Sequence, residues 1–215
     1  MIKAVIFDMD GLIIDSEPLW RKSEMEVFHS MGYHFTEEMC IQTMGMRINE
    51  VVKFWHDQFN WSTPTIDQVI ENIQNKLIEN VLKYGKELEG VNTAIEYLKR
   101  NNILTAIASS SSFKIIAAVT QKLKLEDKFD LIHSAENEIE GKPHPAVFLT
   151  TANKLGVKPE ECLVLEDSNF GMQAGINAGM KVIVIPEKDT QPEWMYNAHY
   201  NYASLSEINW ENHIS

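Results

Sequence analysis

Two aspartates near the start of the chain, Asp8 and Asp10, are the residues best placed to do chemistry. They follow Ala4–Phe7, a run of four apolar residues that is typical of a strand buried on both faces of a parallel sheet. Ligands of open α/β sheets bind beyond the carboxyl ends of the strands. Two carboxylates this close repel each other unless a cation binds or the pKa of one is raised. The pair therefore predicts a cation-binding or acid–base site where the first strand ends.

Two other interpretations of this pair are open. The pattern D-x-D-G, which begins at Asp8, also occurs in EF-hand calcium loops, but a third acidic ligand and the closing glutamate are not in register here and no helix precedes it. A solvated acidic turn is the second alternative. Neither alternative predicts further polar groups at the ends of later strands.

Polar residues do follow later apolar runs that the sequence predicts to be strands. Ser109 follows the run LTAIA, Glu166 and Asp167 follow the run CLVL, and Lys142 stands in a Gly-Lys-Pro turn. A single serine of this kind is more often a helix cap, and a single Lys-Pro is usually a turn. Because the carboxyl ends of parallel strands meet at one edge of a sheet, their joint occurrence predicts a single site.

Phosphoryl transfer is a reaction that needs these residue types. It requires an in-line nucleophile and electrostatic stabilisation of the equatorial phosphoryl oxygens. Asp8 is the predicted nucleophile, because a carboxylate can form an acyl phosphate. Asp10 is the predicted general acid for the leaving oxygen and then the base for water. Ser109 offers a hydroxyl, and Lys142 a positive charge, to the phosphoryl oxygens.

The same acidic residues predict a metal site. Carboxylates beside an anionic substrate repel it, and a hard cation with oxygen ligands removes that repulsion. We expect Mg²⁺ as the cofactor, bound by Asp8, by Asp167 and by the backbone carbonyl of Asp10. Glu166 is expected to join this metal site directly or through water.

The stretch 15–85 has the hydrophobic period of amphipathic helices. Thr65 and Gln68 predict a capping box, and Gly85 predicts a helix end. We expect the apolar side chains of this stretch to pack against one another. Two sets of residues carry the period: Ile48, Val51, Val52, Trp55 and Phe59, and Ile66, Val69, Ile70, Ile73 and Leu77.

After Gly90, predicted helices and strands alternate to near Pro186. This alternation predicts an α/β protein whose mostly parallel sheet is connected by right-handed crossovers. We therefore expect a sheet that begins with the first strand, is interrupted by the helical stretch and then continues.

Four segments together resemble the signatures of the haloacid dehalogenase superfamily: FDMDGLIIDSE, IASSS, GKPHP and VLEDSNFGMQAG. The likeness covers nearly the whole chain and is greatest to the β-phosphoglucomutase-like branch. The segments DSEPLW and GMRINEVVKFW resemble the sugar-phosphate and hexitol-phosphate (2-deoxyglucose-6-phosphate) phosphatases most.

This resemblance implies a Rossmann-like, three-layer parallel-sheet core with an inserted all-helical cap domain. Residues 1–14 and 86–215 would form the core and 15–85 the cap, which closes over the site and selects the substrate. The implied activity is hydrolysis of a hexose or hexitol phosphate through an aspartyl-phosphate intermediate. A sugar phosphomutase and a non-catalytic phosphate sensor are the alternatives.

The resemblance also implies substrate-binding residues, which are Met9, Ser110, Trp20 and the cap residue Arg47. Dehalogenases of the superfamily lack the second aspartate, so Asp10 counts against that activity. In β-phosphoglucomutase a histidine occupies the position of Trp20 and couples cap closure to acid–base work. Tryptophan cannot carry a proton at neutral pH as imidazole does, which favours the phosphatase over the mutase.

Composition limits the partners and the compartment. The net charge of −12 argues against nucleic-acid and anionic-membrane partners, which require a basic face. Cys40 and Cys162 are the only cysteines, too few for a disulfide framework. No signal peptide or membrane-spanning run is evident. We expect a cytoplasmic monomer whose partner is a small phosphorylated molecule.

Overall fold

A parallel sheet forms the centre of the molecule, for which a computed structural model describes residues 1–43, 46–188 and 190–214. The sheet has six strands, and each neighbouring pair is parallel. The predicted α/β class with a parallel sheet is therefore confirmed. In sheet order the strands are β3 (Leu131–Ser134), β2 (Leu104–Ser109), β1 (Ala4–Phe7), β4 (Cys162–Glu166), β5 (Lys181–Val184) and β6 (Tyr200–Asn201).

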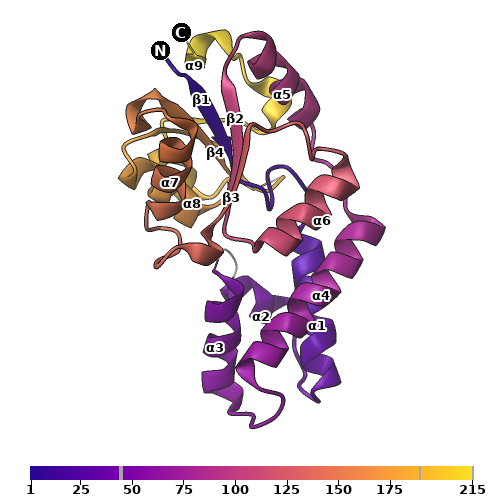
Figure 1. The fold of residues 1–215 in the computed structure, drawn as a ribbon. Coiled ribbons are helices and arrows are strands. Elements are labelled where there is room, and N and C mark those ends of the chain that lie inside the picture. The colour runs from indigo at the N-terminus through magenta and orange to yellow at the C-terminus, as the bar shows by residue number, and fades with distance from the viewer. Residues whose placement is uncertain (44–45, 189, 215) are drawn as a thin grey trace.

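Helices cover both faces of this sheet, which gives the three layers that were predicted (Figure 1). One face carries α7 (Ala146–Leu155) and α8 (Asn169–Asn177), and the other carries α5 (Val91–Arg100), α6 (Phe113–Leu123) and α9 (Glu211–Ile214). Short 3₁₀ turns lie at Ala135–Asn137, Pro159–Glu161, Glu193–Asn197 and Leu205–Glu207.

The central strand β1 divides its side chains between the two outer layers. Successive side chains of a strand point to opposite faces of a sheet. Val5 and Phe7 accordingly belong to the apolar cluster that includes α5 and α6, while Ala4 and Ile6 belong to the cluster that includes α7 and α8. All four residues of β1 are buried, so the strand is held from both sides and the position of Asp8, the next residue, is fixed with it.

The remaining helices form a separate group beside the sheet, which we call the α1–α4 unit (Figure 1). Its members are α1 (Glu17–Ser30), α2 (Glu37–Gln42), α3 (Ile48–Phe59) and α4 (Ile66–Tyr84). The unit has an apolar cluster of its own, in which the rings of Phe28 and Phe35 stack with centroids 4.3 Å apart. A division into a core of 1–14 with 86–215 and a cap of 15–85 remains our proposal.

The two chain segments that join this unit to the sheet run side by side. The backbone N–H of Asp15 donates to the carbonyl of Lys86 at 3.0 Å, and that of Leu88 donates to Ile13 at 3.0 Å. Ile14 and Glu87 form an antiparallel bridge between them. The entry and exit of the α1–α4 unit are therefore fixed to each other directly beyond β1.

A local signal in the sequence accounts for the start of α4. The predicted capping box is present, because Gln68 N–H donates to Thr65 Oγ1 at 3.3 Å and Thr65 N–H donates to Gln68 Oε1 at 2.9 Å.

The sequence did not predict α2, β6 or α9, which have six, two and four residues. Elements this short do not complete enough of a hydrophobic period to be recognised. Among the described residues, no helix has the length and apolar character needed to cross a membrane.

Candidate active site

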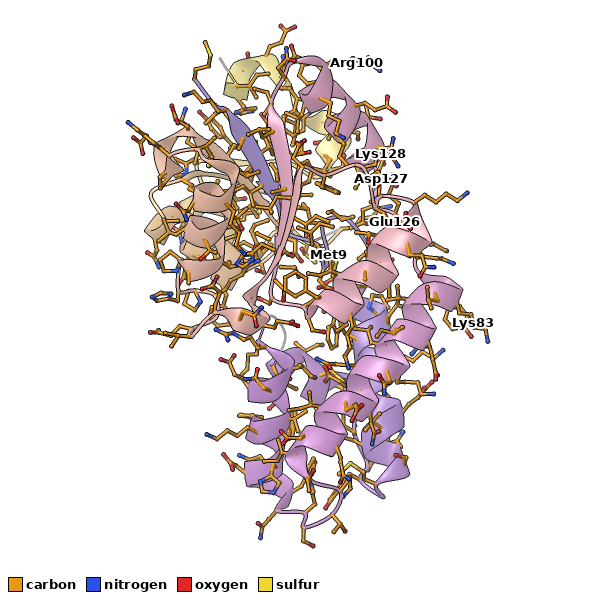
Figure 2. The ribbon with its side chains drawn as sticks, in the orientation of Figure 1. Met9, Lys83, Arg100, Glu126, Asp127 and Lys128 are labelled. Carbon is orange, nitrogen blue, oxygen red and sulfur yellow. The ribbon has the colours of Figure 1, made fainter. Side chains whose placement is uncertain are left out.

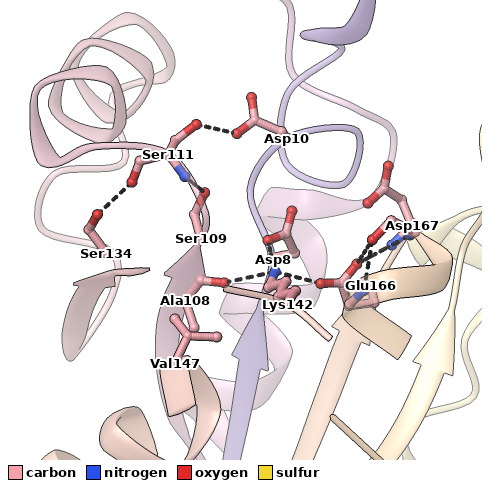
Figure 3. Close-up of polar contacts among 12 residues, drawn as sticks. Asp8, Asp10, Ala108, Ser109, Ser111, Ser134, Lys142, Val147, Glu166 and Asp167 are labelled. Carbon is pink, nitrogen blue, oxygen red and sulfur yellow. Dashed lines mark hydrogen bonds and ion pairs between the residues drawn. The ribbon is translucent and has the colours of Figure 1, made fainter. Parts of the chain in front are cut away.

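Asp8 lies at the centre of the candidate site, directly beyond the carboxyl end of β1. The strands β2 and β4 flank β1 and run parallel to it. Ser109 ends β2 and Glu166 ends β4, so both lie at the same edge of the sheet as Asp8 (Figure 3). The sheet thus brings together residues that are about 100 and 160 positions apart in the sequence.

A buried lysine connects the first and fourth strands at this edge. Lys142 Nζ donates to Asp8 Oδ1, to Glu166 Oε1 at 2.6 Å and to the carbonyl oxygen of Ala108 at 3.4 Å (Figure 3). Its side chain is only 4% exposed. Burial alone would lower the pKa of Lys142, but the carboxylates of Asp8 and Glu166 raise it above its ordinary value. The lysine is therefore a fixed positive charge against Asp8.

One lysine does not balance the acidic groups around it. Oxygen atoms of Asp8, Glu166 and Asp167 lie within 4.8 Å of one another. Burial, with repulsion from Glu166 and Asp10, raises the pKa of Asp8 to about 7 despite the opposing effect of Lys142. Burial and then Glu166 and Asp8 raise the pKa of Asp167 well above its ordinary value. Three carboxylates against one ammonium group fit a hard cation with oxygen ligands.

Glu166 is the member of this cluster whose oxygens are already in use. Its Oε1 accepts from Lys142, and its Oε2 accepts from the backbone N–H of Asp167 at 3.1 Å and from the hydroxyl of Ser168 at 3.0 Å. Asp167 itself is half-buried and lines the cavity above Asp8. Asp8 and Asp167 are thus better placed to bind a metal directly, and Glu166 is better placed to orient Asp167.

Two glycines make room for these carboxylates. A Cβ atom at Gly171, in the first turn of α8, would overlap the carboxylate of Glu166, and one at Gly11 would overlap that of Asp167. Gly11 also has a φ of +73°, which favours glycine on conformational grounds. The position of both carboxylates therefore depends on the absence of a side chain at these two residues.

The carboxylate of Asp10 has its own set of donors. Ser16 Oγ donates to its Oδ1 at 2.7 Å, Trp20 Nε1 donates to the same oxygen at 3.0 Å, and Ser111 Oγ donates to Oδ2 at 2.7 Å. The contact with Ser111 is drawn in Figure 3. Trp20 belongs to α1, so the second aspartate is held by the sheet layer and by the α1–α4 unit together. The side chain of Asp10 does not belong to the acidic cluster of Asp8, Glu166 and Asp167. Only the backbone carbonyl of Asp10 is therefore left for the predicted metal site.

Ser111 is a functional candidate that the sequence did not single out. Besides its bond to Asp10, its backbone N–H donates to Ser109 Oγ at 3.0 Å, and its carbonyl accepts from Ser134 Oγ at 2.6 Å. Ser109 and the half-buried Ser110 both line the cavity. The serine run IASSS was the available signal, but which hydroxyl faces which aspartate depends on how the loop after β2 folds.

A cavity of about 370 Å³ opens above Asp8. Such a volume is in the usual range for small-molecule sites. Its walls come from the sheet edge and from the α1–α4 unit. The polar residues that line it include Asp8, Asp10, Ser109, Ser110, Ser111, Ser112, Lys142, Asp167, Ser168, Asn169, Glu187 and Thr190 from the sheet side, and Glu17, Arg21, Glu24, Thr43 and Arg47 from the helical side.

Arg47 reaches from the α1–α4 unit to the loop that carries Lys142. Its Nη1 donates to the carbonyl of Glu138 at 3.2 Å, and its guanidinium lies so close to Gly141 that a Cβ there would overlap it. Its Nε and Nη2 atoms are buried, and neither has a hydrogen-bond partner among the described residues. Met44 and Gly45, which precede it in the segment TMGMR, lie outside the described residues.

The side chain of Met9, a predicted substrate-binding residue, lies away from the cavity. Its side chain is fully buried in the apolar cluster that includes Ile115 and Ile116, near α6 (Figure 2), and it does not line the cavity. The alternation of side chains along an extended segment turns Met9 away from the face that carries Asp8 and Asp10. The side chain of Met9 is thus not positioned to contact a ligand in this cavity.

Two glutamates of α1 lie in the helical wall of the cavity. Burial and then repulsion from Asp10 raise the pKa of Glu17 to about 7. Burial raises the pKa of Glu24 to about 8, with a further contribution from Glu17, while Cys40 and Arg21 act in the opposite direction. The sequence alone did not mark either residue as functional, because a glutamate on an amphipathic helix is usually solvated.

Comparison with known families agrees with this geometry. The model of a family described as haloacid dehalogenase-like hydrolase matches residues 5–185. The chain is 39% identical over 210 residues to hexitol phosphatase B of Escherichia coli K12, which covers 96% of this chain and 94% of that protein.

Solved structures resemble the whole chain as well. CbbY from Rhodobacter sphaeroides, crystallised in complex with phosphate, superposes with a TM-score of 0.90 at 24% identity and covers 97% of both chains. A β-phosphoglucomutase from Clostridium difficile superposes with a TM-score of 0.85 at 25% identity and covers 99% of this chain and 95% of the other.

The glycine that accommodates Glu166 gives a prediction about metal binding. The methyl group of Gly171→Ala would displace the carboxylate of Glu166, which orients Asp167. Loss of a residue that orients a metal ligand weakens metal affinity by about 10- to 100-fold. We expect a drop of at least about tenfold in Mg²⁺ affinity by isothermal titration calorimetry. Ile176→Ala, at an exposed position of the same helix, is the control. An unchanged titration for Gly171→Ala contradicts the assignment.

The raised pKa of Glu24 gives a prediction about stability. Its pKa is about 8 in the folded chain against an ordinary 4.5, so between these values the unfolded state binds fewer protons and stability falls as pH rises. Glu24→Gln removes this dependence. We expect its Tm to exceed that of the wild type by an amount that grows from pH 5 to pH 8, by at least about 2–4 °C, which is about 1 kcal/mol.

The control for this stability prediction is Glu26→Gln. Glu26 lies on the same helix and its side chain is 43% exposed, so its replacement should leave the pH profile of Tm unchanged. Parallel Tm profiles for Glu24→Gln and the wild type would show that Glu24 is not held protonated by burial.

Proposed function

Because the chain belongs to the haloacid dehalogenase-like hydrolase family, we propose that it is a Mg²⁺-dependent phosphatase that acts on a hexose or hexitol phosphate. The class of activity, hydrolysis of a phosphoric monoester, is the one named for its relatives. The similarity to hexitol phosphatase B extends over nearly the full length of both chains, which supports a phosphorylated sugar or sugar alcohol as the substrate.

The observation that carries this proposal is the position of Asp8. It lies at the floor of the cavity, against the ammonium group of Lys142 and within the acidic cluster that includes Asp167. A nucleophilic carboxylate in phosphoryl transfer needs positive charge on both sides of the phosphoryl group. Lys142 would supply one of these charges and a metal ion the other.

We propose the following roles in the reaction. Asp8 attacks the phosphorus and the ester P–O bond breaks, while Asp10 donates a proton to the leaving oxygen. Asp10 then takes a proton from water as this water attacks the aspartyl phosphate, and the P–O bond to Asp8 breaks to release phosphate. The three hydrogen bonds to Asp10, from Ser16, Trp20 and Ser111, support its role because they hold its carboxylate at the cavity wall.

The metal site in this proposal consists of Asp8, Asp167 and the backbone carbonyl of Asp10, with Glu166 orienting Asp167. Mg²⁺ bound there would neutralise charge between the carboxylates and the phosphoryl oxygens. The excess of buried negative charge supports it.

Contacts to the substrate come from both walls. Ser109, Ser110 and the backbone of Met9 would bind phosphoryl oxygens, and Trp20 and Arg47 would contact the rest of the molecule from the α1–α4 unit. The Nε and Nη2 atoms of Arg47, which have no partner in the described part of the chain, support this role, since buried donors ordinarily have acceptors. A monomeric state and a cytoplasmic location remain predictions.

A phosphomutase is the second candidate, favoured by the similarity to the Clostridium difficile β-phosphoglucomutase. We rank it lower because Trp20 occupies the position of the histidine on which the mutase pattern relies. Its indole can donate to Asp10, as it does at 3.0 Å, but it cannot transfer a proton. A sensor that binds phosphate without turnover is the third alternative, for which an intact Asp10 has no evident purpose.

The test of the phosphatase proposal is phosphate release with and without Mg²⁺. The panel contains sorbitol 6-phosphate, mannitol 1-phosphate, 2-deoxyglucose 6-phosphate and p-nitrophenyl phosphate. We expect Asp8→Asn to lower kcat by at least about 1,000-fold, because it removes the nucleophile and leaves the shape of the side chain. Asp15→Asn, at an exposed neighbouring position, should retain activity. Substantial turnover by Asp8→Asn would exclude the aspartyl-phosphate mechanism.

Hydrolysis and mutase action differ in their products. We expect a ³¹P NMR time course on β-glucose 1-phosphate to show inorganic phosphate and no stimulation by glucose 1,6-bisphosphate. Without proton transfer through residue 20, Asp10 should activate water as readily as a second sugar hydroxyl. Faster accumulation of glucose 6-phosphate than of free phosphate would instead establish the mutase.

A further inference from the structure

One face of α1 forms the part of the cavity wall that lies opposite the sheet. Glu17, Trp20, Arg21 and Glu24 occupy positions i, i+3, i+4 and i+7 of the helix, which share a face, and all four line the cavity. Trp20 contacts Asp10, so its turn lies at the level of the reacting groups. Glu24 lies four residues further along the helix, about 6 Å beyond that level.

Glu24 is buried and has one carboxyl oxygen without a partner among the described residues. It is only 7% exposed, and its Oε2 atom has no hydrogen-bond partner among the described residues. The neighbours that act on it are Cys40, Glu17 and Arg21. A buried polar atom without a partner is unfavourable, and such atoms in native structures call for an explanation.

Ser23, the neighbour of Glu24 on α1, is a buried polar residue whose hydrogen bonds indicate a structural role. Ser23 is also buried, but its hydroxyl donates to the carbonyl of Leu19 at 2.7 Å and accepts from Asn80 Nδ2 at 2.9 Å. That pair joins α1 to α4 with both partners satisfied. Glu24, by contrast, lines the cavity and has an oxygen that accepts no hydrogen bond from any described residue.

The protonation of Glu24 indicates which ligand group it would accept. Because burial raises its pKa to about 8, its carboxyl group is mostly neutral at pH 7 and can both donate and accept a hydrogen bond. A hydroxyl group has the same two capacities. An anionic group would gain less from a neutral carboxyl and would be repelled whenever Glu24 or Glu17 ionised.

We propose that Glu24 is a specificity-determining residue, which hydrogen-bonds a hydroxyl at the end of the substrate distant from the phosphate. The inference rests on the proposed phosphatase function and narrows its substrate class to phosphomonoesters of long polyhydroxylated chains. An extended chain spans about 1.2 Å per bond, so the five carbon–carbon bonds of a hexitol match the rise of about 6 Å along α1 from Trp20 to Glu24. The two carbon–carbon bonds of glycerol 3-phosphate do not.

The experiment compares substrates of different length on variants of one residue. Glu24→Leu should lower kcat/KM for sorbitol 6-phosphate by about tenfold or more. It should leave kcat/KM for glycerol 3-phosphate and p-nitrophenyl phosphate within about twofold of the wild type. Glu24→Gln, which can also donate and accept, should restore kcat/KM for sorbitol 6-phosphate to within about threefold of the wild type.

Two controls separate this role from a structural one. Glu26→Leu changes an exposed side chain of the same helix and should leave kcat/KM for all three substrates unchanged. The Tm of Glu24→Leu should equal or exceed that of the wild type, because a buried carboxyl group with an unpartnered oxygen among the described residues is replaced by an apolar group. A structural glutamate would instead lose stability on this change.

The other outcomes overturn the inference. Equal losses on all three substrates, no loss on any of them, or a wild-type preference for glycerol 3-phosphate each exclude a distal hydroxyl contact at Glu24. Absence of phosphate release from every substrate by the wild type, with Mg²⁺ present, instead rejects the proposed function itself and this inference with it.

Discussion

The structure depends on a concentration of buried negative charge at the carboxyl end of β1. Asp8, Glu166 and Asp167 lie within 4.8 Å of one another, and Lys142 is the ammonium group that contacts two of them. Carboxylates held this closely in a buried site are unfavourable unless cations or protons compensate them. The sheet can keep them there because β1 and β4 are packed from both faces and fix the positions of the next residues in the chain.

The second constraint is that the site is complete only when the α1–α4 unit lies over the sheet edge. Trp20 and Ser16 reach Asp10 from the helical side, while Ser111 reaches it from the loop after β2. Arg47 makes a second contact between the α1–α4 unit and the sheet side, because it donates to the carbonyl of Glu138 in the loop that leads to Lys142. These contacts join Asp10, our proposed acid–base residue, and the loop that carries Lys142 to the same helical unit. The position of this unit and the arrangement of the residues at the sheet edge are therefore coupled.

The sequence predicted the parts of this arrangement that depend on strand ends and helix periods. Asp8 and Asp167 were recognisable because a residue at the end of a buried apolar run has a defined place in a parallel sheet. Lys142 was recognisable because its Gly-Lys-Pro turn belongs to a segment that resembles a family signature. Ser111 and Glu24 were not, since their roles depend on how a loop folds and on which helix face meets the sheet. Met9 shows the same limit, because the neighbour of two site residues still points its side chain into the core.

The acidic composition of the chain places a further demand on the cavity. With a net charge of −12, the molecule as a whole repels a phosphorylated substrate, but at physiological ionic strength this repulsion is screened beyond about 8 Å. Attraction must therefore come from cations inside the cavity, where Lys142, Arg21 and Arg47 lie. Lys142 is committed to Asp8 and Glu166, so it cannot by itself offset both the carboxylates and a dianionic phosphate. This shortage of positive charge is a second argument, besides the chemistry, for the metal ion that we propose, and it leaves the arginines of the helical wall as the cations that we expect to attract the substrate before it reaches Asp8.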